Sequence, residues 1–436
     1  MNRFPSATPI SPPHRKLIAE EAAVVLAVCR AFGIHVLPEA VESLGNAGGF
    51  SGARLWRVSA EGLWCLRAWP VEGPTRAELI VIHDLMLQAA AVLPFVPRLR
   101  SVPGGGQTCI FLNGRLWEMT TWQPGQADFH ADPTPSKLIA AVEALARLHR
   151  VWTPHRPDYG ICPAVLRRMG KLEAWQALPR ERMESALGQS DADLRPWAEQ
   201  ALDAVRRWFV PAWEALTAWS KIAVPLQPCL CDVWHDHILF QGETVTGIVD
   251  YGSVRLDNPA TDLARLLGSM LFEAARPAEG VSSSQSRAEG VSPPCPRLRF
   301  GFQRAEGVSP PCPPVTRQLT LPARLQNEPA RLAADIARPE RQPARPDENA
   351  RRHPSLTWSQ ALDAYDGIRP LSEPERKLAE VLDWTGVVVA LTNWLRWLVL
   401  GERRFENPTE AAKRMRSLTQ RAACRSFPTE NYRFEN

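Results

Sequence analysis

Hydrophobic and polar positions change their spacing several times along the chain. Residues 15–32 repeat apolar side chains at helical intervals and contain neither Pro nor Gly. Three short extended runs follow, at 40–44, 54–58 and 63–69, and they read as strands. The pattern predicts a helix followed by a small sheet.

Residues 76–120 return to helical spacing and then to extended spacing. We expect a helix over 76–92 and strands over 108–112 and 115–120. Asn113-Gly114 separates the two strands, and this dipeptide is the strongest short signal for a hairpin turn. After these strands the pattern breaks up around residues 121–125.

The rest of the chain is dominated by helical spacing. The segment 384–400 is the most apolar, but it is only 17 residues long and contains Asn393 and Arg396. It is too short and too polar for a membrane span, so we expect a buried helix. The expected helices cover 136–148, 163–220 (more than one helix), 259–275, 358–365, 374–382, 384–401 and 409–421.

The segment 229–264 carries the chemistry. Residues 238–240 and 245–251 read as two strands joined by a polar turn at 241–244. Asp232 precedes the first strand and Asp250 closes the second. A hairpin brings its open ends together, so both carboxylates converge beside His235 and His237. One carboxylate can then accept a proton while the other holds a hard cation.

This segment resembles the catalytic core of the phosphotransferases that include aminoglycoside phosphotransferases, choline kinases and type II homoserine kinases. The resemblance implies an α+β, protein-kinase-like fold of two lobes, with a small antiparallel sheet and a mainly helical lobe. Asp232 falls on the catalytic aspartate, and Asp250-Tyr251-Gly252 on the magnesium-binding motif. Two positions depart from the pattern: Leu230 replaces the usual His, and His237 replaces the usual metal-binding Asn.

The resemblance also implies a site for ATP and Mg²⁺. Four glycines lie within the eight residues 45–52, where backbone N–H groups can approach an anion. Arg67 stands where the family has a basic residue for the α- and β-phosphates, and 118–125 corresponds to the hinge between lobes, whose backbone receives the adenine. The nucleotide-binding residues expected on this basis are Gly48, Gly49, Ser51, Gly52, Arg67, Glu118 and Thr120.

Several of these residues have plainer interpretations. The glycine-rich loop can be only a tight turn, and Arg67 can be an exposed residue of an edge strand. Glu78 can pair with Arg67, although the helix dipole alone favours a Glu at that position. His237 can bind the metal, which would favour Mn²⁺ over Mg²⁺. Alternatively, His237 bonds to backbone, or turns away and leaves the metal to Asp236.

Residues 276–352 differ from the rest of the chain. They contain 13 Pro, 13 Arg and eight acidic residues, and the string RAEGVSPPCP occurs twice, at 287–296 and 304–313. Such a composition buries too little apolar surface to fold, so we expect a disordered insertion. The chain's net charge of +4 resides in this segment, which argues against a nucleic-acid-binding face on the folded core.

The expected organisation follows from these boundaries. The nine Cys show no metal-ligand spacing, and the first residues contain no apolar core long enough for export, so we expect reduced thiols in a cytoplasmic protein. The divisions are a disordered terminus (1–14), an N-lobe (15–121), a C-lobe with the catalytic hairpin (122–276), the insertion (277–351), further C-lobe helices (352–425) and a tail (426–436).

Two functions fit these observations. The first is an ATP-dependent kinase that phosphorylates a hydroxyl of a small molecule, with Asp232 as base and Asp250 as metal ligand. The second is a catalytically degenerate relative that binds a nucleotide or metabolite without turnover. His149 and Asp262 are expected to support the catalytic loop rather than react. The acceptor itself cannot be read from the sequence.

Overall fold

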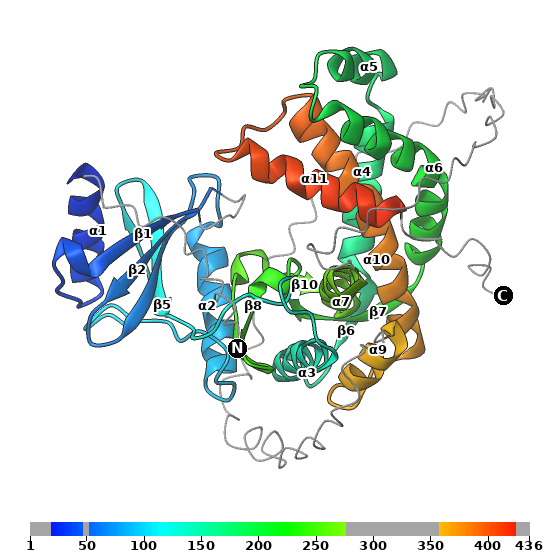
Figure 1. Cartoon of the computed structure of the whole chain (residues 1–436). Helices are drawn as coiled ribbons and strands as arrows, with labels where there is room; N and C mark the ends of the chain where they lie inside the picture. Colours follow the sequence, from blue (N-terminus) through cyan, green and yellow to red (C-terminus); the bar gives the residue numbers. More distant parts are fainter. Residues whose placement is uncertain (1–18, 47–51, 276–356, 424–436) are drawn as a thin grey trace, which may run out of the picture.

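The computed structural model describes residues 19–46, 52–275 and 357–423. The expected insertion (277–351), terminus (1–14) and tail (426–436) all lie outside these ranges. Two lobes are separated along the long direction of the molecule (Figure 1). Among the described residues, no helix combines the length and the apolar character needed to cross a membrane.

A five-stranded antiparallel sheet forms the N-lobe. Its strands lie in the order β1-β2-β3-β5-β4, and α1 (Ala19–Ala31) covers one face (Figure 1). Val28 of α1 and Phe32, which follows the helix, belong to one core with Trp56 and Trp117 of the sheet, whose rings stack 5.3 Å apart. The strands are β1 (Val41–Gly45), β2 (Arg54–Ser59), β3 (Leu63–Ala68), β4 (Cys109–Leu112) and β5 (Arg115–Thr121).

The Asn113-Gly114 turn joins β4 to β5, as predicted. Both residues have positive φ, 49° and 72°, which a two-residue type I′ turn requires and which Asn and Gly tolerate best. Because this turn pairs Leu112 with Arg115, it also sets the register that places Glu118 opposite Cys109.

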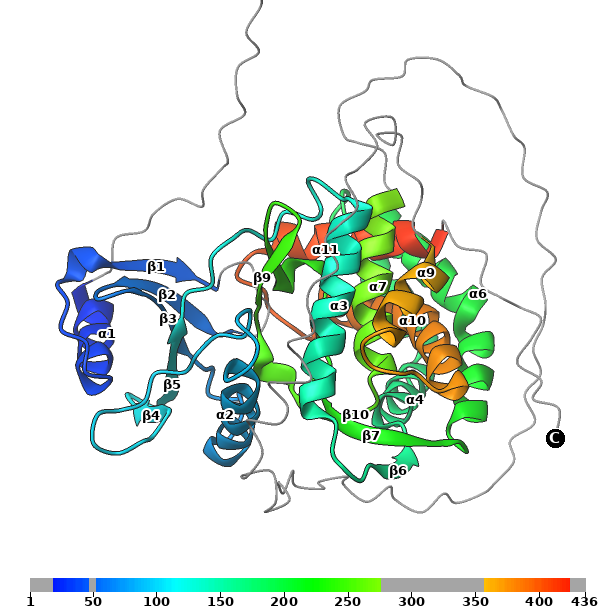
Figure 2. The ribbon, with the colours of Figure 1, turned by 90° about the horizontal axis from the view of Figure 1, so that it is seen from below.

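Helix α2 (Arg76–Ala90) connects the sheet to the helical lobe (Figure 2). Thr75 and Glu78 cap its N-terminus through a reciprocal capping box. Ile82 and Leu85 belong to the core of the helical lobe, and the Trp152 indole N–H donates to the Leu85 carbonyl at 3.1 Å. One face of α2 is therefore fixed to the C-lobe.

The C-lobe is mainly helical. The two helices predicted at 374–382 and 384–401 are in fact one helix, α10, followed by a π-helical segment (Leu395–Val399). Asp383 is buried inside α10 and pairs with Arg421, so this polar residue does not end the helix. The helices are α3 (Pro135–Trp152), α4 (Pro163–Gln176), α5 (Arg180–Gly188), α6 (Arg195–Trp219), α7 (Ala260–Ala275), α9 (Trp358–Asp366), α10 (Glu373–Trp394) and α11 (Pro408–Ala423).

Two small sheets support the site. The predicted hairpin is β8 (Ile238–Gln241) and β9 (Thr244–Ile248). The other sheet was not predicted; it consists of β6 (Asp158–Ile161), β7 (Ala223–Cys229) and β10 (Arg255–Asp257).

Two prolines hide β7 from sequence analysis, because Pro disfavours a central strand. However, β6 pairs only with 223–226 and β10 only with 227–229. Pro225 and Pro228 each therefore have a neighbouring strand on one side only. The end of β7 leads directly into the loop that carries Asp232.

Candidate active site

The loop Leu230-Cys231-Asp232 is held by its backbone. The N–H of Leu230 donates to Asp262 Oδ2 at 2.7 Å, and the N–H of Cys231 donates to Asp262 Oδ1 at 2.6 Å. Cys231 has a positive φ of 63°, which a non-glycine residue adopts only when its surroundings enforce it. Asp262, at the start of α7, thus supports the catalytic loop as predicted.

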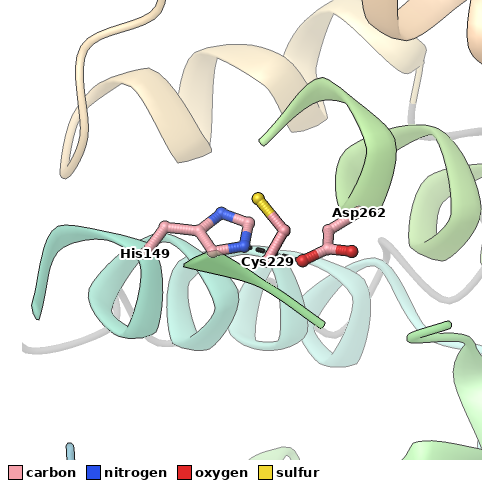
Figure 3. Close-up of side chains that lie close together, drawn as sticks. All are labelled: His149, Cys229 and Asp262. Atoms are coloured by element: carbon pink, nitrogen blue, oxygen red, sulfur yellow. Dashed lines mark hydrogen bonds and ion pairs between the residues drawn. The ribbon is translucent and has the colours of Figure 1, made fainter. Parts of the chain in front are cut away.

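His149 completes this support (Figure 3). Its Nε2 lies 2.9 Å from Asp262 Oδ2, and its Nδ1 lies 2.6 Å from the Tyr365 hydroxyl. Burial lowers the pKa of His149 despite the opposing charge of Asp262. The neutral ring donates from Nε2 and accepts from Tyr365 at Nδ1, so it is a structural residue.

Cys229 lies beside His149 and Asp262 (Figure 3), and in the part of the chain that the structure describes these three are close enough to suggest a metal site. Both nitrogens of His149 and both oxygens of Asp262 already have partners. Burial raises the pKa of the Cys229 thiol well above its ordinary value, whereas a metal ligand must be a thiolate. The cluster is therefore a polar core.

Asp250 lies beyond its strand, not at its end. The sequence predicted a strand through Tyr251, but β9 stops at Ile248. Asp250 then adopts a left-handed conformation with φ 65°. The N–H of Val249 still donates to the His237 carbonyl at 2.9 Å. This hydrogen bond extends the pairing of the hairpin by one residue beyond β9, and Asp250 then turns out of the sheet.

Gly252 follows in a position without room for a side chain. A Cβ there would lie 2.5 Å from Cη2 of Trp69 and 2.8 Å from its Cζ3. Trp69 is buried, and Arg67 stacks on its ring at 4.8 Å. The glycine thus lets the Asp250 turn pack directly on the residues next to Arg67.

Replacing Gly252 with alanine is expected to lower the free energy of unfolding by about 1–3 kcal/mol, because the new methyl group must displace Trp69. Urea denaturation measures this change. Gly170→Ala in α4 is the matched control, since a Cβ there meets nothing within 4 Å; it is expected to leave stability unchanged or raise it by up to about 1 kcal/mol. Equal effects of the two substitutions would contradict the packing argument.

Arg67 of β3 reaches Asp250. Its Nη1 donates to Asp250 Oδ1 at 3.0 Å, and its Nε lies 3.6 Å from Glu118 Oε1. Burial works against ionisation of Asp250, but Arg67 and His237 outweigh it and hold the pKa of Asp250 below its ordinary value. Arg67 is thus a partly buried cation at the site, not an exposed edge residue.

Glu118 occupies a different place from the one expected. The strand β5 continues to Thr121, so Glu118 lies within the sheet, opposite Arg67 of β3, and not in a hinge. Its side chain bonds to His83 Nε2 at 2.8 Å. Burial favours the protonated form, yet His83 and Arg67 lower the pKa of Glu118.

His83 was not identified from the sequence. It lies on the buried face of α2, and its Nδ1 is 2.6 Å from Thr108 Oγ1. Glu78, which was considered as a partner of Arg67, instead caps α2 with Thr75. The sequence did offer one signal for His83: a histidine on the apolar face of a predicted helix is buried and therefore needs a hydrogen-bond partner.

His237 lies next to Asp250, and the charges of Asp250 and Asp232 both affect it. Its Nε2 is 3.7 Å from Asp250 Oδ2 and accepts a hydrogen bond from the Trp234 indole at 2.8 Å. Burial lowers the pKa of His237, while the charges of Asp250 and Asp232 oppose this shift. Both carboxylates therefore act on one imidazole. Asp236, the alternative ligand, pairs with Arg414 and His235 instead.

Asp232 has one close cationic partner that the sequence analysis missed. Arg265 Nη2 of α7 lies 2.7 Å from Asp232 Oδ1, and the two side chains are 46% and 45% exposed. Asp232 therefore remains accessible, and Oδ2 is the oxygen that Arg265 leaves for another partner.

The remaining expected residues are less informative. Gly48, Gly49 and Ser51 lie outside the described residues. Gly52 is described and has a positive φ of 78°, and Thr120 lies in β5 opposite Cys65, half-buried.

Comparisons with known proteins agree with this fold. A family described as "Phosphotransferase enzyme family" matches residues 43–294. A spectinomycin phosphotransferase, in complex with ADP and spectinomycin, is 9% identical with a TM-score of 0.54, over 92% of this chain and 97% of that one. An amicoumacin kinase, solved with AMP-PNP and Ca²⁺, is 10% identical with a TM-score of 0.52, over 93% of each chain. No curated protein sequence matches. The predicted two-lobe fold and its family are confirmed.

Proposed function

Because the chain belongs to the phosphotransferase enzyme family, we propose that it transfers the γ-phosphate of ATP to a hydroxyl of a small molecule. The observation that supports this proposal is that the charges of Asp232 and Asp250 both act on His237, whose Nε2 lies 3.7 Å from Asp250 Oδ2. Arg67 adds a cation bonded to Asp250. A base, a metal ligand and a phosphate-binding cation are then grouped as phosphoryl transfer requires.

The nucleotide and the metal are proposed from the donor set. The similar structures contain ADP or AMP-PNP, and one contains Ca²⁺. Asp250 supplies an ionised oxygen, the ligand type that Mg²⁺ prefers, and His237 Nε2 lies close enough to share the ion if Trp234 releases it. When bound, the cation would neutralise the charge of the phosphates.

The side chains divide the remaining work. Arg67 keeps its Nη2 for the α- and β-phosphates, while its other nitrogens face Asp250 and Glu118. Asp232 Oδ2 orients the acceptor hydroxyl and takes its proton late in the reaction. The acceptor oxygen forms a bond to the γ-phosphorus, the bond from phosphorus to the β-phosphate oxygen breaks, and ADP leaves. Asp262 and His149 keep Asp232 in place through the loop backbone.

The proposed nitrogen ligand predicts a metal preference. We expect faster transfer with Mn²⁺ than with Mg²⁺, because imidazole favours transition ions. His237→Asn should reverse this preference, and Trp234→Phe should strengthen it by freeing Nε2. Initial rates in matched titrations of both ions measure the effect. Equal or lower rates with Mn²⁺ in the wild-type protein would contradict a role for His237 as a ligand.

One observation favours the alternative of binding without turnover. His237 Nε2 already accepts the Trp234 N–H, so this nitrogen is not available to a cation unless that hydrogen bond breaks. In that case ATP would bind, as a thermal shift would show, but no hydroxyl compound would be phosphorylated.

The deciding experiment is a screen of a metabolite extract with γ-labelled ATP, in which wild type is compared with Asp232→Ala. The proposed kinase labels at least one extract component in an Asp232-dependent way. Nucleotide binding without any Asp232-dependent product would support the alternative.

A further inference from the structure

The surroundings of Asp232 are basic. Arg265 Nη2 forms an ion pair with Asp232 Oδ1 at 2.7 Å, and a guanidinium carries five N–H donors in all. Because the Arg265 side chain is 46% exposed, its other N–H groups remain accessible beside the oxygen that would orient the acceptor hydroxyl. An arginine fork in this position matches a carboxylate or a phosphate in geometry and charge.

More cations lie next to Arg265. Lys171 of α4 is exposed, and α4 packs against β10, which carries the exposed Arg255. Desolvation lowers the pKa of Lys171, and repulsion from four neighbouring arginines lowers it further. These arginines are Arg168, Arg167, Arg255 and Arg265. Lys171 is thus surrounded by charges of its own sign.

The acidic side chains nearby already have partners. Asp257 is buried and accepts bonds from Arg167, Thr261 and the backbone N–H of Asn258. Asp236 pairs with Arg414, whose guanidinium stacks on the Trp234 ring at 3.4 Å. Apart from Asp232 and Asp250 themselves, the accessible charge described around Arg265 comes from Lys171 and Arg255, so a polyamine would meet cations there.

We propose that the acceptor carries an anionic group, a carboxylate or a phosphate ester, close to the hydroxyl that is phosphorylated. Arg265 binds this group while Asp232 holds the hydroxyl, and Lys171 and Arg255 supply long-range attraction. The proposal rests on the function proposed above. It distinguishes this chain from phosphotransferases whose acceptors are recognised through several amino groups.

The first test divides the extract before the reaction. Ion exchange at neutral pH separates cationic, neutral and anionic pools, and each is incubated with γ-labelled ATP and either wild type or Asp232→Asn. Asp232-dependent product is expected from the anionic pool. Arg265→Gln and Lys171→Gln should each raise the half-saturating amount of that pool about tenfold. The KM for ATP should change less than about twofold. Arg206→Gln on α6, an exposed arginine away from the site, should change neither value.

Product from the cationic or neutral pool alone would overturn the proposal. So would an equal rise in the KM for ATP, because the arginine would then serve the nucleotide's phosphates. Treating the active pool with phosphatase before the reaction distinguishes the two anion types. Loss of the acceptor indicates a phosphate ester, whereas an acceptor that persists indicates a carboxylate.

A second measurement does not need turnover. Titration calorimetry with glycolate and with inorganic phosphate, each in saturating ADP, is expected to show binding that Arg265→Gln weakens about tenfold and Arg206→Gln leaves unchanged. Arg265-dependent binding without transfer from any pool would refute the proposed function but support the anion site. The anion site would be refuted if neither probe showed binding that depends on Arg265 and the anionic pool gave no product.

Discussion

Replacing Asp232 with asparagine is expected to lower the rate of phosphoryl transfer by a factor of about 10²–10⁴, the usual contribution of a positioned general base. Asparagine has the same shape, but it cannot accept the proton of the acceptor hydroxyl. The measurement is the turnover rate at saturating ATP with the acceptor found by the extract screen.

The same variant should fold and bind nucleotide normally. Asp232 is 45% exposed and pairs with an equally exposed Arg265, so the loss of this pair should change the free energy of unfolding by no more than about 1 kcal/mol. A rate within tenfold of wild type would show that Asp232 is not the base. A large loss of stability would show that the rate effect is structural.

Replacing Asp262 with alanine is expected to lower the free energy of unfolding by about 3–5 kcal/mol, because three donors lose a charged acceptor at a cost of about 1–3 kcal/mol each. The backbone N–H groups of Leu230 and Cys231 would lose their acceptor, and His149 Nε2 would lose its partner. Each of these groups is then buried without a hydrogen bond. Urea denaturation followed by tryptophan fluorescence measures the change.

Asp203→Ala provides the comparison for this substitution. Asp203 is also an aspartate on a helix, but its side chain is 75% exposed and pairs with Arg206, one turn further along the same helix. Its removal should change stability by no more than about 0.5 kcal/mol. If Asp262→Ala cost less than about 1 kcal/mol, the proposed anchoring of the catalytic loop would be wrong.

The departure at Leu230 has a structural explanation in the same contacts. Where the family usually has histidine, this chain has a buried leucine whose backbone, not its side chain, bonds to Asp262. The imidazole that bonds to Asp262 comes from α3, as His149. The loop is therefore anchored without a histidine of its own.

Local patterns predicted the elements whose signals are local. The Asn113-Gly114 turn, the hairpin around 241–244 and most helices follow from turn residues and spacing. Patterns failed where tertiary contacts override them. The two helices predicted on either side of Asp383 are one helix, in which Asp383 is buried and pairs with Arg421, and β7 contains two prolines that its open sides accommodate.

The candidate site also contains some residues that local patterns reveal and others that only tertiary contacts reveal. Asp232, Asp250 and Arg67 could be identified because each lies in a short motif or next to a recognisable strand. The pairing of Arg67 with Glu118 depends on the register between β3 and β5. His83 and Arg265 depend on which face of a helix is turned inward. No local pattern encodes register or helix rotation relative to a distant strand, so these residues required the structure.

The central claim is that Asp232 and Asp250 act at one site in different roles, and calorimetric titration with ATP and Mg²⁺ tests it most directly. Asp250→Asn should lose the metal-dependent part of ATP affinity, whereas Asp232→Asn should bind ATP as wild type does while transferring phosphate about 10²–10⁴ times more slowly. Wild-type affinity in Asp250→Asn, or an equal loss of affinity in both variants, would contradict the account.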